Sequence, residues 1–377
     1  MEFRDLKRQY DYNKEEINNA IQKVIDSAQF IGGNPVNELE ERLASYVGVK
    51  HCITCANGTD ALQLALMAMG IQAMDAVFVP DFTFFATAEV IPWVGAIPIF
   101  VDIDKETFNI SVDSLENAIL EVIKEGKYTP KGVIAVDLFG QPADYKKIRE
   151  ITNKYDLLLI EDGAQGFGGS IKGRKACSFG DISTTSFFPA KPLGCYGDGG
   201  AIFTDNDEWA DLIKSYKVHG KGTDKYDNVR IGMNSRLDTI QAAILLAKLD
   251  IFINEELESV NKVAHFYHEN LNHILEIPKI KKGYYSSWAQ YTIVLHDKEE
   301  RDRLQEYLKL QQIPTMIYYG KPMHDQKAFE EEKQYVDLSI TSEICDRVLS
   351  LPMHPYLEEK EQGKIVEHIK YAINLNE

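Results

Sequence analysis

Two residues of opposite charge stand where two β-like segments of the chain end. Asp162 closes the aliphatic run 157–162, and Lys191 follows the run 182–188 on a proline-containing turn. A continuous apolar run is typical of a strand buried on both faces of a parallel sheet, and open α/β sheets bind ligands at the carboxyl ends of their strands. We therefore expect Asp162 and Lys191 to face one shared cleft.

The chemistry of this pair suggests a cofactor. A lysine held away from bulk water has a lowered pKa, so its amine can form a Schiff base with an aldehyde. A carboxylate that faces a pyridine nitrogen keeps that nitrogen protonated, which lets the ring accept electrons. Pyridoxal 5'-phosphate (PLP) carries both groups. The sequence therefore predicts a PLP enzyme with Lys191 as covalent anchor and Asp162 as partner of the ring nitrogen.

A candidate phosphate site precedes an apolar helix expected over residues 61–69. Asn57 is suited to cap that helix, Gly58 lets the backbone come close to a ligand, and Thr59 adds a hydroxyl. Free N–H groups at a helix start bind phosphate well. A plain capped helix explains these residues equally well.

Three phenylalanines follow the next expected strand, at positions 82, 84 and 85. An aromatic ring just past a strand end could stack on a flat cofactor. Phenylalanines in such a cluster more often belong to the core.

Other motifs are less convincing. The glycine-rich run 163–169 lacks the spacing of a dinucleotide fingerprint, since position 171 is isoleucine and no clean helix follows.

Cys52 and Cys55 form a CxxC that could be a redox or zinc half-site. No second pair follows at zinc spacing, so small buried strand residues are the better interpretation. We expect no metal site.

Bulk composition limits the possible partners and compartment. The chain has 377 residues and a formal net charge of −17, which disfavours nucleic-acid binding and adhesion to anionic membranes. The first residues lack the apolar core of a secretion signal. Prolines and acids interrupt the most apolar region, residues 77–100, so a buried sheet and helix fit it better than a membrane span. We expect a cytoplasmic protein.

Strand-like and helix-like segments alternate along residues 51–162, which predicts an α/β fold with a mostly parallel central sheet covered by helices. A long helix is expected over 237–252, with a helical extension over 253–274 that carries the chain onward. Beyond it we expect strands at 290–295 and 315–318 and helices at 298–311 and 359–374. The predicted division is a large domain, 1–252, and a smaller C-terminal α+β domain, 253–377.

A basic stretch interrupts this acidic chain between residues 214 and 236. It contains Lys225 and Arg236 among six cationic residues, together with Gly220 and Gly222. A mobile loop that meets an anion is one interpretation, and a solvated loop is as good an alternative.

Taken together, these motifs resemble those of the StrS/DegT-like sugar aminotransferases, a PLP-dependent family with the aspartate aminotransferase fold (fold type I). The resemblance runs from Phe3-Arg-Asp-Leu to Leu351-Pro-Met-His-Pro, and the most specific segments begin at Asn57, Glu161, Ser186 and Asn234. The family aminates nucleotide-linked keto sugars. Within it, the chain looks most like enzymes that act on UDP-2-acetamido-2-deoxy-3-oxo-glucuronate, in surface polysaccharide and lipopolysaccharide synthesis.

The resemblance implies a role for each matching residue. Lys191 and Asp162 would be catalytic, Lys191 also shuttling protons; Gln165 would lie near the phenolic oxygen, and Phe84 would cover the cofactor face. The phosphate would be held by Gly58, Thr59 and Ser186, and by Asn234 of a neighbouring subunit, so the working unit would be a homodimer with composite sites. The implied substrate contacts are Arg236, Tyr318, Tyr319 and His324.

L-glutamate is the amino donor that the resemblance implies. The chain departs from its close relatives at residues 318–320, where Tyr-Tyr-Gly replaces a common His-Tyr-Pro near the sugar. Other keto sugars, a dehydratase or other PLP enzyme of the same fold, and a regulatory protein without turnover remain alternatives, although family dehydratases carry histidine where this chain has Lys191.

Overall fold

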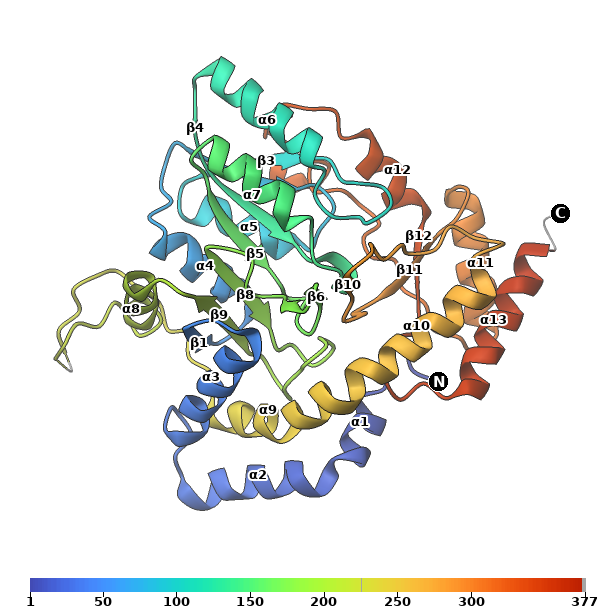
Figure 1. Ribbon diagram of the computed structural model, residues 1–377, viewed down its shortest axis with the longest axis horizontal. Coiled ribbons are helices and arrows are strands. Elements are labelled where there is room, and N and C mark those ends of the chain that lie inside the picture. Colours follow the sequence, from blue (N-terminus) through green and yellow to red (C-terminus); the bar gives the residue numbers. More distant parts are fainter. Residues whose placement is uncertain (225, 375–377) are drawn as a thin grey trace.

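The computed structural model describes residues 1–224 and 226–374, and a seven-stranded sheet forms its centre (Figure 1). Five adjacent strands run parallel, and the strand β9 pairs antiparallel with both of its neighbours. The predicted mostly parallel α/β fold is confirmed. In spatial order the strands are β1 (His51–Cys55), β9 (Gly200–Thr204), β8 (Ile182–Ser186), β5 (Leu158–Asp162), β4 (Thr129–Val136), β2 (Asp75–Pro80) and β3 (Ile97–Val101).

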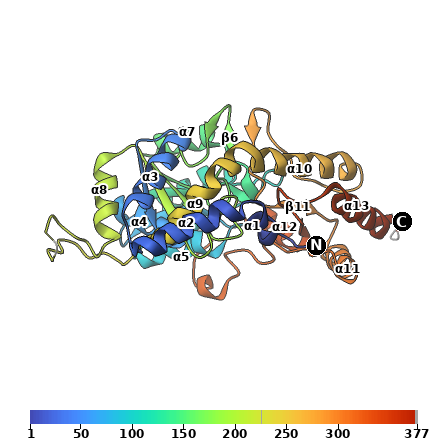
Figure 2. The same cartoon turned by 90° about the horizontal axis from the view of Figure 1, so that it is seen from below.

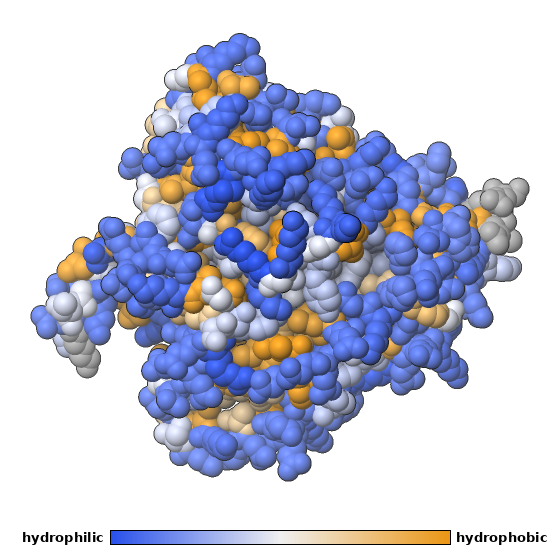
Figure 3. All heavy atoms as spheres, viewed as in Figure 1, coloured by the Kyte–Doolittle hydropathy of each residue, from blue (hydrophilic) through white to orange (hydrophobic). Residues whose placement is uncertain are grey.

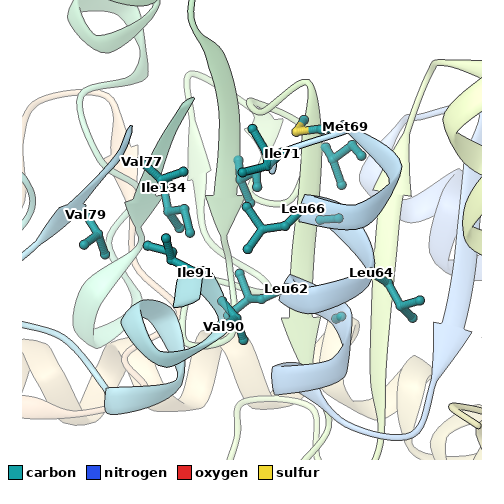
Figure 4. Packing of buried hydrophobic residues seen from close by; sticks show 14 of the residues in the cluster. Leu62, Leu64, Leu66, Met69, Ile71, Val77, Val79, Val90, Ile91 and Ile134 are labelled. Carbon is teal, nitrogen blue, oxygen red and sulfur yellow. The ribbon is translucent and has the colours of Figure 1, made fainter. Parts of the chain in front are cut away.

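Both faces of this sheet are buried, because successive side chains of a strand point to opposite sides. Val77 and Val79 of β2 pack with the helices α4 (Gly58–Ala68), α5 (Phe85–Trp93) and α8 (Asp207–Tyr216). Figure 4 shows part of this cluster, including Leu62, Leu66 and Ile134. On the other face, Phe78 packs with α6 (Val112–Glu125) and α7 (Tyr145–Lys154).

A continuous helical path leads from the sheet to a second core. The helix α9 (Thr239–Ile251) packs with α3 (Asn34–Val47), then passes through the π-helical turn Phe252–Glu256 into α10 (Leu257–Leu271). Beyond it, α10 packs with α11 (Lys298–Leu310), α13 (Glu359–Asn374) and the two-stranded sheet β11 (Tyr291–Val294) and β12 (Val348–Leu351). The predicted helical extension is confirmed, and the domain boundary after residue 252 stays a prediction.

Several short elements complete the described residues. They are α1 (Leu6–Tyr12), α2 (Lys14–Ser27), η1 (Leu138–Gly140), β6 (Ser170–Ile171), β7 (Arg174–Lys175), β10 (Tyr284–Tyr285), η3 (Lys327–Phe329) and α12 (Ser339–Arg347).

The strand predicted at residues 315–318 is wrong. Only Met316 forms an isolated bridge, to Ser350 of β12, and the chain then leaves the small sheet. Residues 317–321 line a cavity instead. The helix α12 was not predicted.

Hydrophilic residues predominate on the face of the molecule shown in Figure 3, with apolar residues in scattered patches between them.

Cys52 and Cys55 are buried in β1 and carry free thiols, as expected of small strand residues. Within residues 1–224 and 226–374, no helix combines the length and the apolar character that crossing a bilayer requires.

Candidate active site

A cavity of about 980 Å³ opens at the carboxyl ends of β2, β5 and β8. Asp162 and Lys191 both line it, so the structure brings together the two residues that the sequence singled out. Nine of the predicted site residues lie in its wall: Gly58, Thr59, Phe84, Asp162, Gln165, Ser186, Lys191, Tyr318 and Tyr319.

Asp162 is buried at the last position of β5 and is held by two donors. The Thr87 hydroxyl donates to Oδ2 at 2.9 Å, and the Ala164 N–H donates to Oδ1 at 3.1 Å. Burial raises the pKa of the Asp162 carboxyl, while the Ala164 N–H, the positive charge of Lys191 and the Thr87 hydroxyl oppose that rise. A cation placed beside Asp162 would favour its ionised form further.

Lys191 stands on a turn after β8 that is closed by a backbone hydrogen bond. The Lys191 N–H donates to the Phe188 carbonyl at 2.8 Å. Withdrawal from bulk water lowers the pKa of the Lys191 amine; Asp162 opposes that shift, and the nearby Arg4 adds to it. A lysine with a lowered pKa holds more of the neutral amine that attacks a carbonyl.

The start of α4 forms one end of the cavity. The helix begins at Gly58, three residues before the expected position, and the Asn57 side chain caps it by accepting from the Asp60 N–H at 2.8 Å. A Cβ on Gly58 would lie 2.7 Å from the Cβ of Ser186, so only glycine lets the helix start approach β8 this closely. The free N–H groups and the Ser186 hydroxyl suit an anion such as phosphate.

The three phenylalanines divide between the core and the cavity. Phe82 is 1% exposed, and Phe85 packs on Phe329 with ring centroids 5.3 Å apart. Phe84 is 53% exposed in the cavity wall, near the Tyr319 ring. Core packing is therefore the correct interpretation for Phe82. Phe85 is partly buried, packs against the core and also lines the cavity, and Phe84 is free to meet a flat ligand.

Gln165 joins the two sides of the cavity. Its Oε1 accepts from the Phe139 N–H at 2.7 Å, and its Nε2 donates to the Tyr319 hydroxyl at 3.1 Å. Tyr319 and Tyr318 come from the segment that follows the isolated bridge, so a polar contact connects this segment to the loop after β5.

Three predicted site residues are placed outside the wall of this cavity. His324 lies against Asp81, which accepts from its Nδ1 at 2.6 Å and from its backbone N–H at 2.8 Å. Asn234 accepts a hydrogen bond from Arg236 at 2.7 Å in the exposed segment after α8. Lys225 of the basic stretch lies outside the described residues.

Two contacts of the central pair were missed in the sequence. Thr87 is one helical turn into α5, and Arg4 is near the chain start, where its Nη2 donates to the Lys191 carbonyl at 2.9 Å. The spacing of residues along the chain carried no signal for either contact. Only the packing of α5 and of the N-terminal segment creates them.

The residues present fit PLP. An anion site, an aromatic wall, a buried carboxylate and an amine of lowered pKa surround one cavity, and these groups suit the phosphate, the flat ring, the ring nitrogen and the aldehyde of the cofactor. Among the described residues, no group of three or more His, Cys, Asp or Glu side chains is placed to hold a metal ion.

Comparisons with known proteins agree with this geometry. The model of the DegT/DnrJ/EryC1/StrS aminotransferase family matches residues 11–370. A Pseudomonas aeruginosa protein, UDP-2-acetamido-2-deoxy-3-oxo-D-glucuronate aminotransferase, is 46% identical over 361 residues, which cover 95% of this chain and 96% of that protein.

Solved structures show the same fold. The crystal structure of a DegT DnrJ EryC1 StrS aminotransferase from Brucella abortus is 48% identical, with a TM-score of 0.96 over 98% of this chain and 99% of that one. NtdA from Bacillus subtilis with bound cofactor PMP is 31% identical, with a TM-score of 0.88 over 96% and 82% of the two chains.

Proposed function

The chain belongs to the DegT/DnrJ/EryC1/StrS aminotransferase family, and we propose that it is a PLP-dependent enzyme that transfers the amino group of L-glutamate to a nucleotide-linked keto sugar. The observation that carries the proposal is the presence of Asp162 and Lys191 in one cavity, next to the anion site at the start of α4. The proposed sugar is UDP-2-acetamido-2-deoxy-3-oxo-glucuronate, in lipopolysaccharide or other surface polysaccharide synthesis. The printed activity of the Pseudomonas relative supports this sugar.

Bound PLP would supply an aldehyde that carries the amino group between the two substrates and a ring that accepts electrons. Gly58, Thr59 and Ser186 would hold its phosphate, and Asp162 would face its ring nitrogen. Phe84 would cover one face of the ring, and Gln165 would lie beside its phenolic oxygen.

Lys191 would act as the base and acid of the reaction. Its Nζ would hold a proton between removal from one carbon and delivery to the next, which requires an amine that is neutral for part of the cycle. The lowered pKa of Lys191 supports this role. Tyr318 and Tyr319, on the facing wall, would contact the sugar and restrict the entry of water.

The proposal includes a homodimer with composite sites. The segment after α8 projects away from the body in two perpendicular views (Figures 1 and 2), and it exposes the apolar residues Val229 and Ile231. A second copy of the chain would cover these residues. Asn234 and Arg236 would then reach the cofactor phosphate and the substrate in the neighbouring cavity, and His324 would lie near the sugar. We place the enzyme in the cytoplasm and divide it at residue 252.

An assay with purified protein, PLP, L-glutamate and the UDP-keto sugar tests the proposal. We expect 2-oxoglutarate and a UDP-amino sugar in equal amounts, and no turnover by Lys191→Ala. A panel of UDP-, dTDP- and GDP-linked keto sugars would identify the preferred substrate. Elimination of water from the sugar without 2-oxoglutarate formation would favour a dehydratase, and a wild-type protein inactive with every sugar would contradict the proposal.

A further inference from the structure

Arg4, in the N-terminal segment, contacts the backbone of the lysine turn. Its Nη2 donates to the Lys191 carbonyl at 2.9 Å and, more weakly, to the Pro192 carbonyl at 3.4 Å. The two partners are 187 residues apart in the sequence. A guanidinium that holds the Lys191 carbonyl fixes the peptide plane directly after the Cα of Lys191, which restrains the direction in which the lysine side chain leaves the turn.

The segment that carries Arg4 is anchored on the side away from the lysine turn. The Phe3 carbonyl accepts from the Met353 N–H at 3.1 Å, and the Phe3 ring lies 6.1 Å from the ring of Tyr318 in the cavity wall. Arg8 pairs with Glu361 at 2.7 Å. The N-terminus accordingly lies beside α13 in both views (Figures 1 and 2). Arg4 is therefore fixed between the Lys191 turn and the facing wall.

Arg4 also contributes charge. Its guanidinium lowers the pKa of the Lys191 amine, in the same direction as the larger effect of burial and against that of Asp162. The cavity wall contains three further charged residues, Asp60, Asp198 and Lys321. On its other side, Arg4 faces Glu256 and Tyr356.

We propose that Arg4 is a positioning residue for Lys191: it fixes the carbonyl of the lysine turn and places a second positive charge beside the amine. The inference rests on the proposed function, because only a reactive Lys191 needs such support. Loss of the two hydrogen bonds should misplace the amine, and a misplaced group costs up to about 100-fold in rate.

The test measures the covalent reaction of Lys191 with PLP in the absence of any sugar. The amine condenses with the aldehyde and releases water, and borohydride then reduces the C=N bond to a secondary amine that marks Lys191 for mass spectrometry. Labelling rates are measured from pH 6 to pH 10 for wild type, Arg4→Met, Arg4→Lys and the control Lys7→Gln. Lys7 lies on the same segment, is exposed and pairs with Asp11 of its own helix rather than with the lysine turn. kcat and KM are then measured for each variant with L-glutamate and the UDP-keto sugar.

Arg4→Met removes both the hydrogen bonds and the charge. We expect its labelling to slow about 10-fold at neutral pH and its pH midpoint to rise, with kcat reduced about 10-fold or more and KM changed little. Arg4→Lys keeps the positive charge but loses the planar guanidinium that donates to both carbonyls. The pH midpoint of its labelling should therefore stay near that of wild type, while its labelling rate above that midpoint falls. Lys7→Gln should label at the wild-type rate.

Two results would overturn the inference: wild-type labelling and kcat in Arg4→Met, or equal losses in Lys7→Gln. If thermal unfolding shows that Arg4→Met does not fold, Arg4→Lys decides alone: wild-type labelling rates contradict the inference, and a reduced rate at an unchanged midpoint supports it. A wild-type protein that PLP does not label at Lys191 would instead contradict the proposed function.

Discussion

Asp162 depends on its neighbours for its charge. Burial raises the pKa of this carboxyl, and the Thr87 hydroxyl is one of the groups that oppose the rise. The ring nitrogen of PLP needs the ionised carboxylate. Activity should therefore fall on the acid side, as Asp162 becomes protonated.

Thr87→Val removes a donor to the Asp162 carboxylate while keeping the size of the side chain. The pKa of Asp162 should rise, so the acid limb of the kcat/KM profile should move to higher pH, with activity at alkaline pH reduced only a few-fold. Thr184→Val is the control, since Thr184 is equally buried and its hydroxyl contacts the Glu161 carbonyl instead. An acid limb that stays in place in Thr87→Val would show that this hydroxyl does not set the charge of Asp162.

Gly58 allows the close approach of α4 and β8. Gly58→Ala would bring its Cβ to 2.7 Å from the Cβ of Ser186, so one side of the anion site must shift. We expect PLP affinity, measured by absorbance titration of the apoprotein, to fall about 10-fold or more, because preorganised N–H groups are displaced.

Gly363→Ala provides the matched control for this glycine substitution. Gly363 lies in α13 with open space around its Cα, so alanine should stabilise that helix by about 0.5–1 kcal/mol without changing PLP affinity. Equal affinities of the two variants would argue against a phosphate site at Gly58.

At the scale of elements, the segment that follows Met316 needs an anchor because it pairs with no strand. Asp81, directly after β2, supplies it: the side chain accepts from the His324 ring and backbone, and the Asp81 carbonyl accepts from the Met323 N–H at 2.9 Å. Asp81 thus holds the wall that carries Tyr318 and Tyr319.

The hydrogen bond between Asp81 and His324 should make the free energy of unfolding depend on pH. The hydrogen bond with Asp81 raises the pKa of His324 above its usual 6.5, burial opposes the rise, and Asp325 and Asp102 add to it. A raised histidine pKa contributes stability that is fully present below about pH 6.5 and is lost as pH rises through the folded-state pKa. Burial also raises the pKa of Asp81 above its usual 3.8; this contribution to stability is present below about pH 3.8 and is lost as pH rises through the folded-state pKa of Asp81.

His324→Gln should remove that pH-dependent contribution. Urea unfolding of wild type should show a free energy that declines from about pH 6 to about pH 9, and the variant should show a smaller decline. His296→Gln is the control, because the side chain of His296 is 89% exposed. A parallel decline in wild type and His324→Gln would mean that the anchor is not protonated.

At the scale of the whole molecule, the placement of Asn234 and Arg236 is explained by the proposed dimer. Both flank the buried Ser235, whose hydroxyl accepts from the Ala56 N–H at 3.1 Å, and neither lines the cavity of its own chain. In a composite site, Lys191 and Asn234 would come from different copies.

Mixing two inactive variants tests this arrangement. Lys191→Ala and Asn234→Ala, each with low activity alone, should regain up to about one quarter of wild-type activity after subunit exchange, since half of the dimers are mixed and each mixed dimer has one intact site. Lys191→Ala mixed with Asp162→Asn is the control and should stay inactive, because both residues line one cavity of one chain. Recovery in the control, or none with Asn234→Ala, would contradict the composite site.

Local patterns were enough to predict the central sheet and the edge that carries the two charged residues. Asp162 closes an aliphatic run and Lys191 follows the β-like run 182–188, so a shared position at the carboxyl edge of the sheet was predictable. The start of α4 was predicted three residues late, although its Asn57 cap was identified, because the apolar pattern begins only at Ala61. The strand at 315–318 was predicted wrongly, because residues 317 and 318 line the cavity wall instead of pairing in a sheet.

Only the tertiary structure decided which side chains support the site. Phe82 and Phe84 are two residues apart and chemically identical, yet the packing of α5 buries one and exposes the other. The contact of Arg4 with Lys191 and that of His324 with Asp81 join residues 187 and 243 positions apart. Such contacts depend on how separate elements pack together, and no local pattern of residues encodes that arrangement.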